Sequence, residues 1–379
     1  MMKRRIKVLQ LHPDYNIKAH DFADLGEQIF KALPDDRYET VNAFLRGCPA
    51  PGAPESRAHR SVYFELSDAQ LKGLRIRALW ALFQFCRAEQ FDVVICNRFK
   101  PVNMMLQLTR WLKVPLCIGI AHGFGEYDRF YRRRQAKRLI DKSWRFVGVS
   151  PAVKQYLLDC DCGFTESNTV AITNAIDIEQ AKALQLTREE AREQLGLDPS
   201  VRLIGALGRL VPVKGHIYLI RAFASLKDRH VDAQLAIIGA GREEKNLLAE
   251  VDRLGLTGRV HLLGFRADAL QYVRAFDIWT MPSLAEGLGL ALLEGMSGAL
   301  PVIASNVPAM LPLIEGAGGI AVPPADSSAL SGALDTYLSL SDAQLREKGN
   351  QAYQYLVENH EIFSFRQKYL SLIEGSLKD

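Results

Sequence analysis

Short apolar runs alternate with amphipathic, helix-like segments along nearly the whole chain. In the first half they predict strands at 6–11, 92–97, 116–121 and 146–149, with helices at 71–88, 102–113, 133–142 and 152–158. In the second half they predict strands at 168–172, 201–207, 234–238, 259–263, 277–280, 301–304 and 319–322, with helices at 216–227, 243–254, 269–276, 288–297 and 327–338. This alternation is typical of parallel, doubly wound sheets. Eleven expected strands fit two sheets better than one, because open sheets rarely exceed about ten.

The length of 379 residues suits two domains, each with a full core. The polar stretch 165–168 and the charged segment 187–194 indicate where the connection between them lies. We therefore predict a first domain over residues 1–168 and a second over 169–354.

Composition is that of an ordinary soluble globular protein, with 48% hydrophobic and 24% charged residues. A net charge of +4 is too mild to indicate a nucleic-acid partner, and none is expected. The apolar run at 6–11 is too short for a signal peptide, so a cytoplasmic location is expected. The six cysteines show no zinc-like or disulfide-like spacing and are expected to stay reduced.

Two glutamates stand eight residues apart in the stretch 286–294, which reads Glu-Gly-Leu-Gly-Leu-Ala-Leu-Leu-Glu. If a helix begins near Leu288, Glu286 and Glu294 are separated by roughly 12 Å along its axis. That span suits a ligand with a sugar at one end, a ribose at the other and a diphosphate between them. The glycines leave amides exposed at a helix N-terminus, which favours phosphate. The alternative is a surface helix whose two acids face water.

Two cations follow the apolar strand expected at 201–207. Arg209 and Lys214 flank a short loop there, in the segment Gly-Arg-Leu-Val-Pro-Val-Lys-Gly. A nucleoside diphosphate gains negative charge as it leaves a sugar, so cations fixed beside it stabilise the transition state. The alternative is a pair of solvated loop cations, which is the usual place of lysine and arginine.

Taken together, these segments resemble the donor-binding signature of family 4 glycosyltransferases (glycosyl transferases group 1). The matching segments are G-R-L-x-x-x-K-G at 208–215, D-I-x-x-x-P-S at 277–283, E-G-x-G-L-x-x-x-E at 286–294 and G-A-L-P-V-I-A-S at 298–305, which resembles the family's G-x-P-V-I-A-S segment. The resemblance implies an α/β GT-B fold: two Rossmann-like, doubly wound parallel-sheet domains with a cleft between them. It also implies that a C-terminal helix, at about 355–379, packs back on the first domain.

The family implies a retaining, metal-independent transfer of a hexose or N-acetylhexosamine from a nucleotide-sugar, with UDP-sugar favoured over GDP-sugar and no cofactor. Arg209 and Lys214 would hold the diphosphate, Glu294 the ribose hydroxyls, and Glu286 the sugar hydroxyls. The expected donor-binding residues are Arg209, Lys214, Glu286, Gly287, Leu288, Gly289, Leu290 and Glu294. The expected catalytic residues are Glu286, His122, Arg209 and Lys214, and no metal ligand is expected.

His122 follows the strand expected at 116–121, so it projects from a strand's carboxyl end. In the resembling enzymes a histidine here lies near the donor sugar, whereas a lone loop histidine more often makes only a local hydrogen bond. The loop after the first strand departs from the family. It reads His-Pro-Asp-Tyr-Asn-Ile-Lys-Ala-His over 12–20, without the usual pair of glycines, so side chains must act there.

Six of the ten residues 129–138 are basic. On a helix, Arg133, Arg134, Lys137 and Arg138 form adjacent rows on one face. Two interpretations stay open: a solvated helix face, or a surface for an anionic glycolipid acceptor and the cytoplasmic face of the inner membrane. By family analogy we expect a bacterial envelope glycolipid, lipopolysaccharide core, as the acceptor.

Three other classes remain as alternatives. We call Arg209 and Lys214 the clamp, because together they would hold the diphosphate. A sugar-nucleotide epimerase would share the GT-B fold but should lack this clamp paired with the two glutamates. An NAD-dependent oxidoreductase needs a complete glycine fingerprint, and Glu244 stands where the third glycine should follow Gly239 and Gly241. A non-enzymatic scaffold would bind membrane through 129–138 and show no nucleotide affinity.

Overall fold

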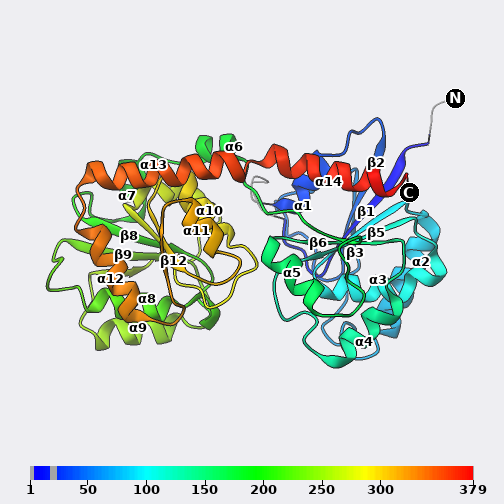
Figure 1. Cartoon of the computed structure of the whole chain (residues 1–379), viewed down its shortest axis with the longest axis horizontal. Helices are drawn as coiled ribbons and strands as arrows, with labels where there is room; N and C mark the ends of the chain where they lie inside the picture. The colour runs from blue at the N-terminus through cyan, green and yellow to red at the C-terminus, as the bar shows by residue number, and fades with distance from the viewer. Residues whose placement is uncertain (1–3, 18–23, 379) are drawn as a thin grey trace. The chain divides into compact units, whose positions relative to one another are not determined.

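The computed structural model describes residues 4–17 and 24–378, which form two compact units (Figure 1). The first unit comprises Met1–Asn174 and Ile362–Asp379, and the second Ala175–Glu361. Each unit is built on its own parallel sheet with helices on both faces. The predicted fold class, two doubly wound parallel-sheet domains, is confirmed. Within the described residues, no helix is long and apolar enough to cross a membrane.

The first sheet has seven strands in the order β3-β2-β1-β4-β5-β6-β7, and every neighbouring pair is parallel. Its central strands are apolar on both faces and almost wholly buried, as a sheet covered on both sides requires. The strands are β1 (Ile6–His12), β2 (Tyr38–Phe44), β3 (Arg60–Tyr63), β4 (Val93–Asn97), β5 (Leu116–Ala121), β6 (Trp144–Gly148) and β7 (Thr169–Ala171).

Figure 1 shows α1 and α14 on one side of the first sheet, with α3 and α4 on the other. Contacts between α1 and α14, between α2 and α3, and between α3 and α4 hold these layers together. The helices are α1 (Leu25–Lys31), α2 (Ile76–Glu89), α3 (Phe99–Leu112), α4 (Phe130–Leu139), α5 (Pro151–Asp159) and α14 (Ile362–Ser376).

The sequence pattern missed α1, β2 and β3. In β2, polar Thr40 and Asn42 are buried among the apolar residues and interrupt the run. The Asn42 amide donates to Glu27 of α1 at 3.0 Å, so a tertiary contact satisfies a group that looked exposed. β7 pairs with β6 and therefore belongs to the first unit. The first unit thus continues past the predicted boundary at residue 168, and the two units divide between Asn174 and Ala175.

The second sheet has six parallel strands in the order β10-β9-β8-β11-β12-β13. The strands are β8 (Arg202–Leu207), β9 (Ala233–Ile238), β10 (Val260–Leu262), β11 (Ile278–Met281), β12 (Val302–Ser305) and β13 (Ile320–Val322). The helices are α6 (Ile178–Leu184), α7 (Arg188–Leu195), α8 (His216–Ala224), α9 (Glu244–Arg253), α10 (Leu290–Ser297), α11 (Leu311–Gly316), α12 (Ser327–Leu338) and α13 (Asp342–Asn359), with 3-10 helices η2 (Pro212–Lys214) and η3 (Ala269–Ala275).

The C-terminal helical tail is broken. α13 ends at Asn359, and the His360 carbonyl accepts a hydrogen bond from Ile176 of the second unit at 3.0 Å. α14 then begins at Ile362 and belongs to the first unit. The segment that returns to the first unit therefore starts later than the predicted residue 355.

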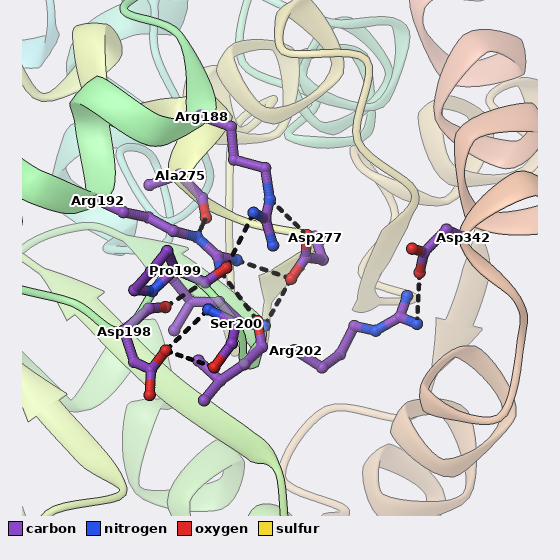
Figure 2. A network of polar contacts seen from close by, with 11 residues as sticks. Arg188, Arg192, Asp198, Pro199, Ser200, Arg202, Ala275, Asp277 and Asp342 are labelled. Carbon is purple, nitrogen blue, oxygen red and sulfur yellow. Dashed lines mark hydrogen bonds and ion pairs between the residues drawn. The ribbon is translucent and has the colours of Figure 1, made fainter.

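A buried ion pair ties α7 to the amino ends of β8 and β11 (Figure 2). The Arg192 side chain is fully buried and donates to Asp277 at 2.8 Å. Asp277 also accepts the Leu203 amide at 2.7 Å and a hydrogen bond from Arg188. The remaining Arg192 donors meet the carbonyls of Asp198, Pro199, Val201 and Ala275. Asp277, which matched the donor signature, is thus a structural residue at the opposite end of β11 from Glu286.

Breaking this pair should destabilise the protein strongly, because a buried arginine would lose its counter-charge. We predict that Asp277→Asn lowers the free energy of unfolding by about 3 kcal/mol. The matched control is Asp342→Asn, since Asp342 pairs with Arg202 but its side chain is 73% exposed. That exposed pair should contribute less than about 1 kcal/mol. Equal losses in the two variants, measured by urea unfolding, would contradict the structural role of Asp277.

Candidate functional site

The loops that leave the carboxyl ends of β8, β9 and β11 pack against one another through their backbones. The Leu210 amide donates to the Ala240 carbonyl at 2.9 Å, joining the loops after β8 and β9. The Leu284 amide donates to the Val213 carbonyl at 2.7 Å, joining the loops after β8 and β11. Ligands of doubly wound sheets bind beyond this edge. The packing of these loops therefore decides which side chains meet there.

Gly215 permits the close approach of the loops after β8 and β11. Its φ is +68°, and a Cβ atom built on it would lie 2.0 Å from the Pro282 carbonyl oxygen. Any residue with a Cβ atom at this position would force the two loops apart. The preceding residue, Lys214, is thereby held beside the loop that carries Glu286.

Lys214 and Glu286 form an ion pair, with Lys214 Nζ 2.6 Å from Glu286 Oε1. Their side chains are 18% and 14% exposed, so the pair is largely shielded from water yet reachable. The structure thus brings together two predicted residues that lie 72 positions apart in the chain. An ammonium group has three donors, so Lys214 can hold Glu286 and still donate to a ligand. Their expected roles toward diphosphate and sugar remain predictions.

Arg209 lies on the same loop after β8, and its side chain is exposed. Its guanidinium makes no hydrogen bond or ion pair with the rest of the described chain, so this group is available to a ligand. Arg209 and Lys214 therefore present two cations from one loop, as the spacing predicted.

Two further polar residues lie at this edge: His216, which the sequence analysis did not mention, and Ser283, which it matched to the donor signature without giving it a role. His216, at the start of α8, is buried with its ring against the backbone of Gly208 and Arg209. Burial, and then Lys214, lowers the pKa of His216 to about 4. Ser283 Oγ is buried and has no hydrogen-bond partner among the described residues, which is unusual for a buried hydroxyl. A polar residue directly after an apolar strand was the signal that could have found Ser283.

α10 begins at Leu290, after Gly289 with a φ of +96°, and not near Leu288. Glu286 consequently lies in the loop outside the helix, and the 12 Å separation expected along a helix axis does not apply. Glu294 lies about one turn inside α10 and is half-buried. α10 itself is held against β11, where Trp279 Nε1 donates to the Ala291 carbonyl at 2.8 Å.

A second polar cluster lies at the carboxyl edge of the first sheet. His122 follows β5, and its Nε2 is 3.2 Å from Oδ1 of Asn97, the last residue of β4. His12, the last residue of β1, is buried, and its Nε2 accepts a hydrogen bond from the Gln10 amide at 2.8 Å. The sequence analysis treated His12 only as part of a loop, although its place at the end of a buried strand marked it. Lys18, Ala19 and His20 of that loop lie outside the described residues.

These histidines are neutral at physiological pH. Burial, then His122 and Arg98, lowers the pKa of His12 to about 3. Burial, then Arg98, lowers the pKa of His122 to about 4. Burial raises the pKa of Glu126 to about 7. A hydrogen bond with the Phe99 backbone and the charges of Arg98 and Arg132 oppose this rise. The edge of the first sheet therefore holds two neutral histidines that can donate and accept hydrogen bonds, with the charged Arg98 beside them.

α4 carries the predicted basic cluster, and its arginines divide into two sets. Arg132 and Arg133 hold the preceding loop, donating to the carbonyls of Glu126 and Tyr127 at 2.8 Å each. Lys137 Nζ lies 3.9 Å from Asp161. Arg134 and Arg138 are exposed and make no contact of this kind within the described chain. Of the four residues expected to face an acceptor or membrane, these two are the free ones.

Comparison with known families identifies both units. Residues 28–180 match Glycosyltransferase Family 4, and residues 187–362 match Glycosyl transferases group 1. The family 4 match falls mainly in the first unit and the group 1 match mainly in the second, and we call the matched parts the family 4 domain and the group 1 domain. Lys214 and Glu286 both lie in the group 1 domain, and His12 precedes the matched part of the family 4 domain.

Related proteins are glycosyltransferases with different acceptors. A D-inositol 3-phosphate glycosyltransferase of Corynebacterium urealyticum is 30% identical over 48% of this chain and 45% of its own length. A UDP-Gal:alpha-D-GlcNAc-diphosphoundecaprenol alpha-1,3-galactosyltransferase of Escherichia coli is 25% identical over 61% of this chain and 62% of its own. The similarity thus spans about half the length of these relatives.

Solved structures show the same fold across the whole chain. Anabaena Alr3699/HepE in complex with UDP matches with a TM-score of 0.81 and 21% identity, covering 98% of this chain and 100% of that one. A glycosyltransferase from Rickettsia africae matches with a TM-score of 0.82 and 18% identity, covering both chains fully. The protein therefore has the GT-B glycosyltransferase fold.

The neutral histidines of the family 4 domain make stability depend on pH. His12 and His122 have pKa values of about 3 and 4 when folded, below the ordinary value of 6.5, so the unfolded chain binds more protons between these values. The stability that they contribute is complete above pH 6.5 and is lost as pH falls toward 4. We predict that His122→Asn flattens the fall in Tm over this window. An unchanged slope would show that His122 is not held neutral.

Proposed function

We propose that this chain transfers a hexose or N-acetylhexosamine from a nucleotide-sugar, a UDP-sugar, to an anionic glycolipid of the bacterial envelope, with retention of configuration and without a metal ion. The observation that carries this proposal is the Lys214–Glu286 pair. It unites the two donor motifs of the group 1 domain at the edge where ligands of such sheets bind.

The arrangement suits a leaving nucleoside diphosphate. As the bond between the anomeric carbon and the diphosphate breaks, negative charge grows on the phosphate oxygens. Lys214 is already fixed by Glu286, and Arg209 is available, so both cations can meet that charge with little reorganisation. Arginine can bind two phosphate oxygens at once, and lysine supplies a compact point charge. Two such cations take the place that a metal ion would fill.

UDP is favoured as the nucleotide because the Anabaena protein of the same fold is described in complex with UDP and with UDP-glucose. Glu294 would accept hydrogen bonds from the ribose hydroxyls, and Glu286 would orient the hydroxyls of the transferred sugar. The amides near Leu288–Leu290 would meet phosphate at the start of α10. Ser283, with its free buried hydroxyl, is a further group that this ligand could satisfy.

An anionic acceptor is favoured by α4 and by the relatives. The names of the two relatives above place a phosphate or diphosphate on the acceptor. Arg134 and Arg138 are one turn apart and make no ion pair or hydrogen bond through their side chains with the described residues, so they could bind such a group. His122, at the edge of the same unit, would contact the sugar under transfer. Lipopolysaccharide core is the acceptor that we propose.

Transfer should fail without the clamp. We predict that Lys214→Ala or Arg209→Ala lowers kcat/KM for UDP-sugar transfer at least tenfold, because transition-state charge loses a fixed counter-charge. The matched control is Lys348→Ala on α13, an exposed lysine of the same unit, which should leave kcat/KM unchanged.

Wild-type turnover in both clamp variants, with Tm unchanged, would remove the clamp from the mechanism. The same assay in excess EDTA tests metal independence. Activity should persist there, and a loss that Mg²⁺ or Mn²⁺ restores would contradict the proposal.

The two glutamates should separate by role. Glu294→Gln should weaken UDP binding in calorimetry, because an amide accepts ribose hydrogen bonds less strongly than a carboxylate. Glu286→Gln should largely keep UDP affinity, since the amide oxygen can still accept from Lys214, but it should lower turnover with the full donor at least tenfold. The reverse pattern would show that the ligand lies the other way along the site.

A further inference from the structure

Five large apolar side chains are exposed together on the first unit, at the N-terminal turns of α2 and α4. The exposed fractions are 81% for Leu74, 70% for Ile76, 60% for Trp80, 75% for Phe130 and 57% for Tyr131. We call these five residues the aromatic face. Singly exposed apolar residues are normal, but a group of this size on one surface marks an interaction site.

Side-chain contacts show that the two helix ends are neighbours. Arg75, just before α2, donates to Asn103 of α3, and Asn103 donates to Gln135 of α4 at 2.7 Å. Tyr131 and Arg132 are also near enough to affect the pKa of Arg75, which burial lowers. The amino end of α2 and α4 therefore both meet at Asn103 of α3, so the two parts of the aromatic face lie on neighbouring elements.

α4 has a clear inner and outer side. Arg132, Gln135, Ala136 and Leu139, at helical spacing, are turned toward the protein and are buried or half-buried. Tyr131, Arg134 and Arg138, spaced three and four apart, lie on the outer side. Aromatic and basic side chains thus share one exposed surface.

The surroundings of the aromatic face are basic and contain no acid from its own two segments. Residues 72–88 and 129–140 include no aspartate or glutamate. Basic side chains follow the face instead: Lys72, Arg77, Arg129, Arg134 and Arg138 are all exposed. Arg129 also donates to the Tyr131 hydroxyl at 3.2 Å, so the aromatic and cationic groups form one unit.

Tryptophan, tyrosine and basic residues together are the combination that favours the interface of an anionic bilayer. A protein partner would be expected to match the apolar side chains with a shaped surface, but would not require a segment free of acids. We propose that the aromatic face enters the headgroup region of an anionic bilayer, with Arg134 and Arg138 on its phosphates.

The aromatic face lies close to the carboxyl edge of the first sheet. α4 follows directly on the loop that begins with His122 at the end of β5 and is pinned to that loop by Arg132 and Arg133. A bilayer bound at α4 would therefore lie close to the edge of the sheet where His122 stands. The link between this contact and a lipid-borne acceptor rests on the proposed function; the contact itself does not.

Tryptophan fluorescence offers a direct test with a matched control. Trp144 and Trp279 are buried, whereas Trp80 and Trp111 are 60% and 68% exposed. Trp111 lies at the opposite end of the helix layer, in the last turn of α3. Trp111→Phe leaves Trp80 as the exposed reporter, and Trp80→Phe leaves Trp111.

With vesicles of phosphatidylglycerol and phosphatidylcholine carrying brominated acyl chains, we expect quenching in Trp111→Phe and little in Trp80→Phe. Co-sedimentation should fall at least tenfold in Leu74→Ser/Trp80→Ser and in Arg134→Gln/Arg138→Gln, but not in Trp111→Ser. Vesicles of phosphatidylcholine alone should bind weakly.

Equal quenching in both reporters would overturn the proposal, as would wild-type co-sedimentation in both double variants or the absence of vesicle binding by the wild-type chain. UDP affinity is measured in parallel on the wild-type chain. If UDP fails to bind while the Trp80 reporter is quenched, the proposed function fails and the bilayer contact stands. If UDP binds while vesicles do not, the reverse holds.

Discussion

The close backbone approach of the loops after β8, β9 and β11 is the constraint on which the second unit's site depends. Gly215 allows the Pro282 carbonyl to come within a distance that no Cβ would tolerate, and Gly239 does the same for the Gly208 carbonyl. Lys214 and Glu286 can pair only because those loops touch. Gly215 and Gly239 therefore act by setting where the charged side chains stand.

The polar side chains at the two sheet edges differ in charge. In the second unit, fixed charges are presented in a partly shielded place, which suits a ligand that gains charge as it leaves. In the first unit, burial and the nearby Arg98 keep His12 and His122 neutral, so these two side chains offer hydrogen bonds while Arg98 carries the charge. A neutral histidine is the better partner for sugar hydroxyls, since it can both donate and accept.

The sequence shows the basic residues of α4 as one cluster. In the structure, some of them hold a loop of the protein and others face outward. Arg132 packs over the Phe99 ring at 4.1 Å and joins Arg133 in holding the loop that follows β5. Only the outer arginines are left for a partner. The proposed bilayer contact would therefore share one short helix with the residues that hold the loop after β5.

The sequence alone predicted the parallel α/β architecture and most strands, because buried parallel strands are continuous apolar runs. It also placed Lys214 and Glu286, which the structure brings together, in loops that follow the carboxyl ends of two strands. It could not reveal β2, whose buried Asn42 is satisfied by Glu27, or the structural role of Asp277, whose partner Arg192 is 85 residues away. Nor could it show the aromatic face, since Trp80 and Trp144 read alike as apolar residues. Burial is a property of what packs against a side chain, and only the tertiary structure supplies those neighbours.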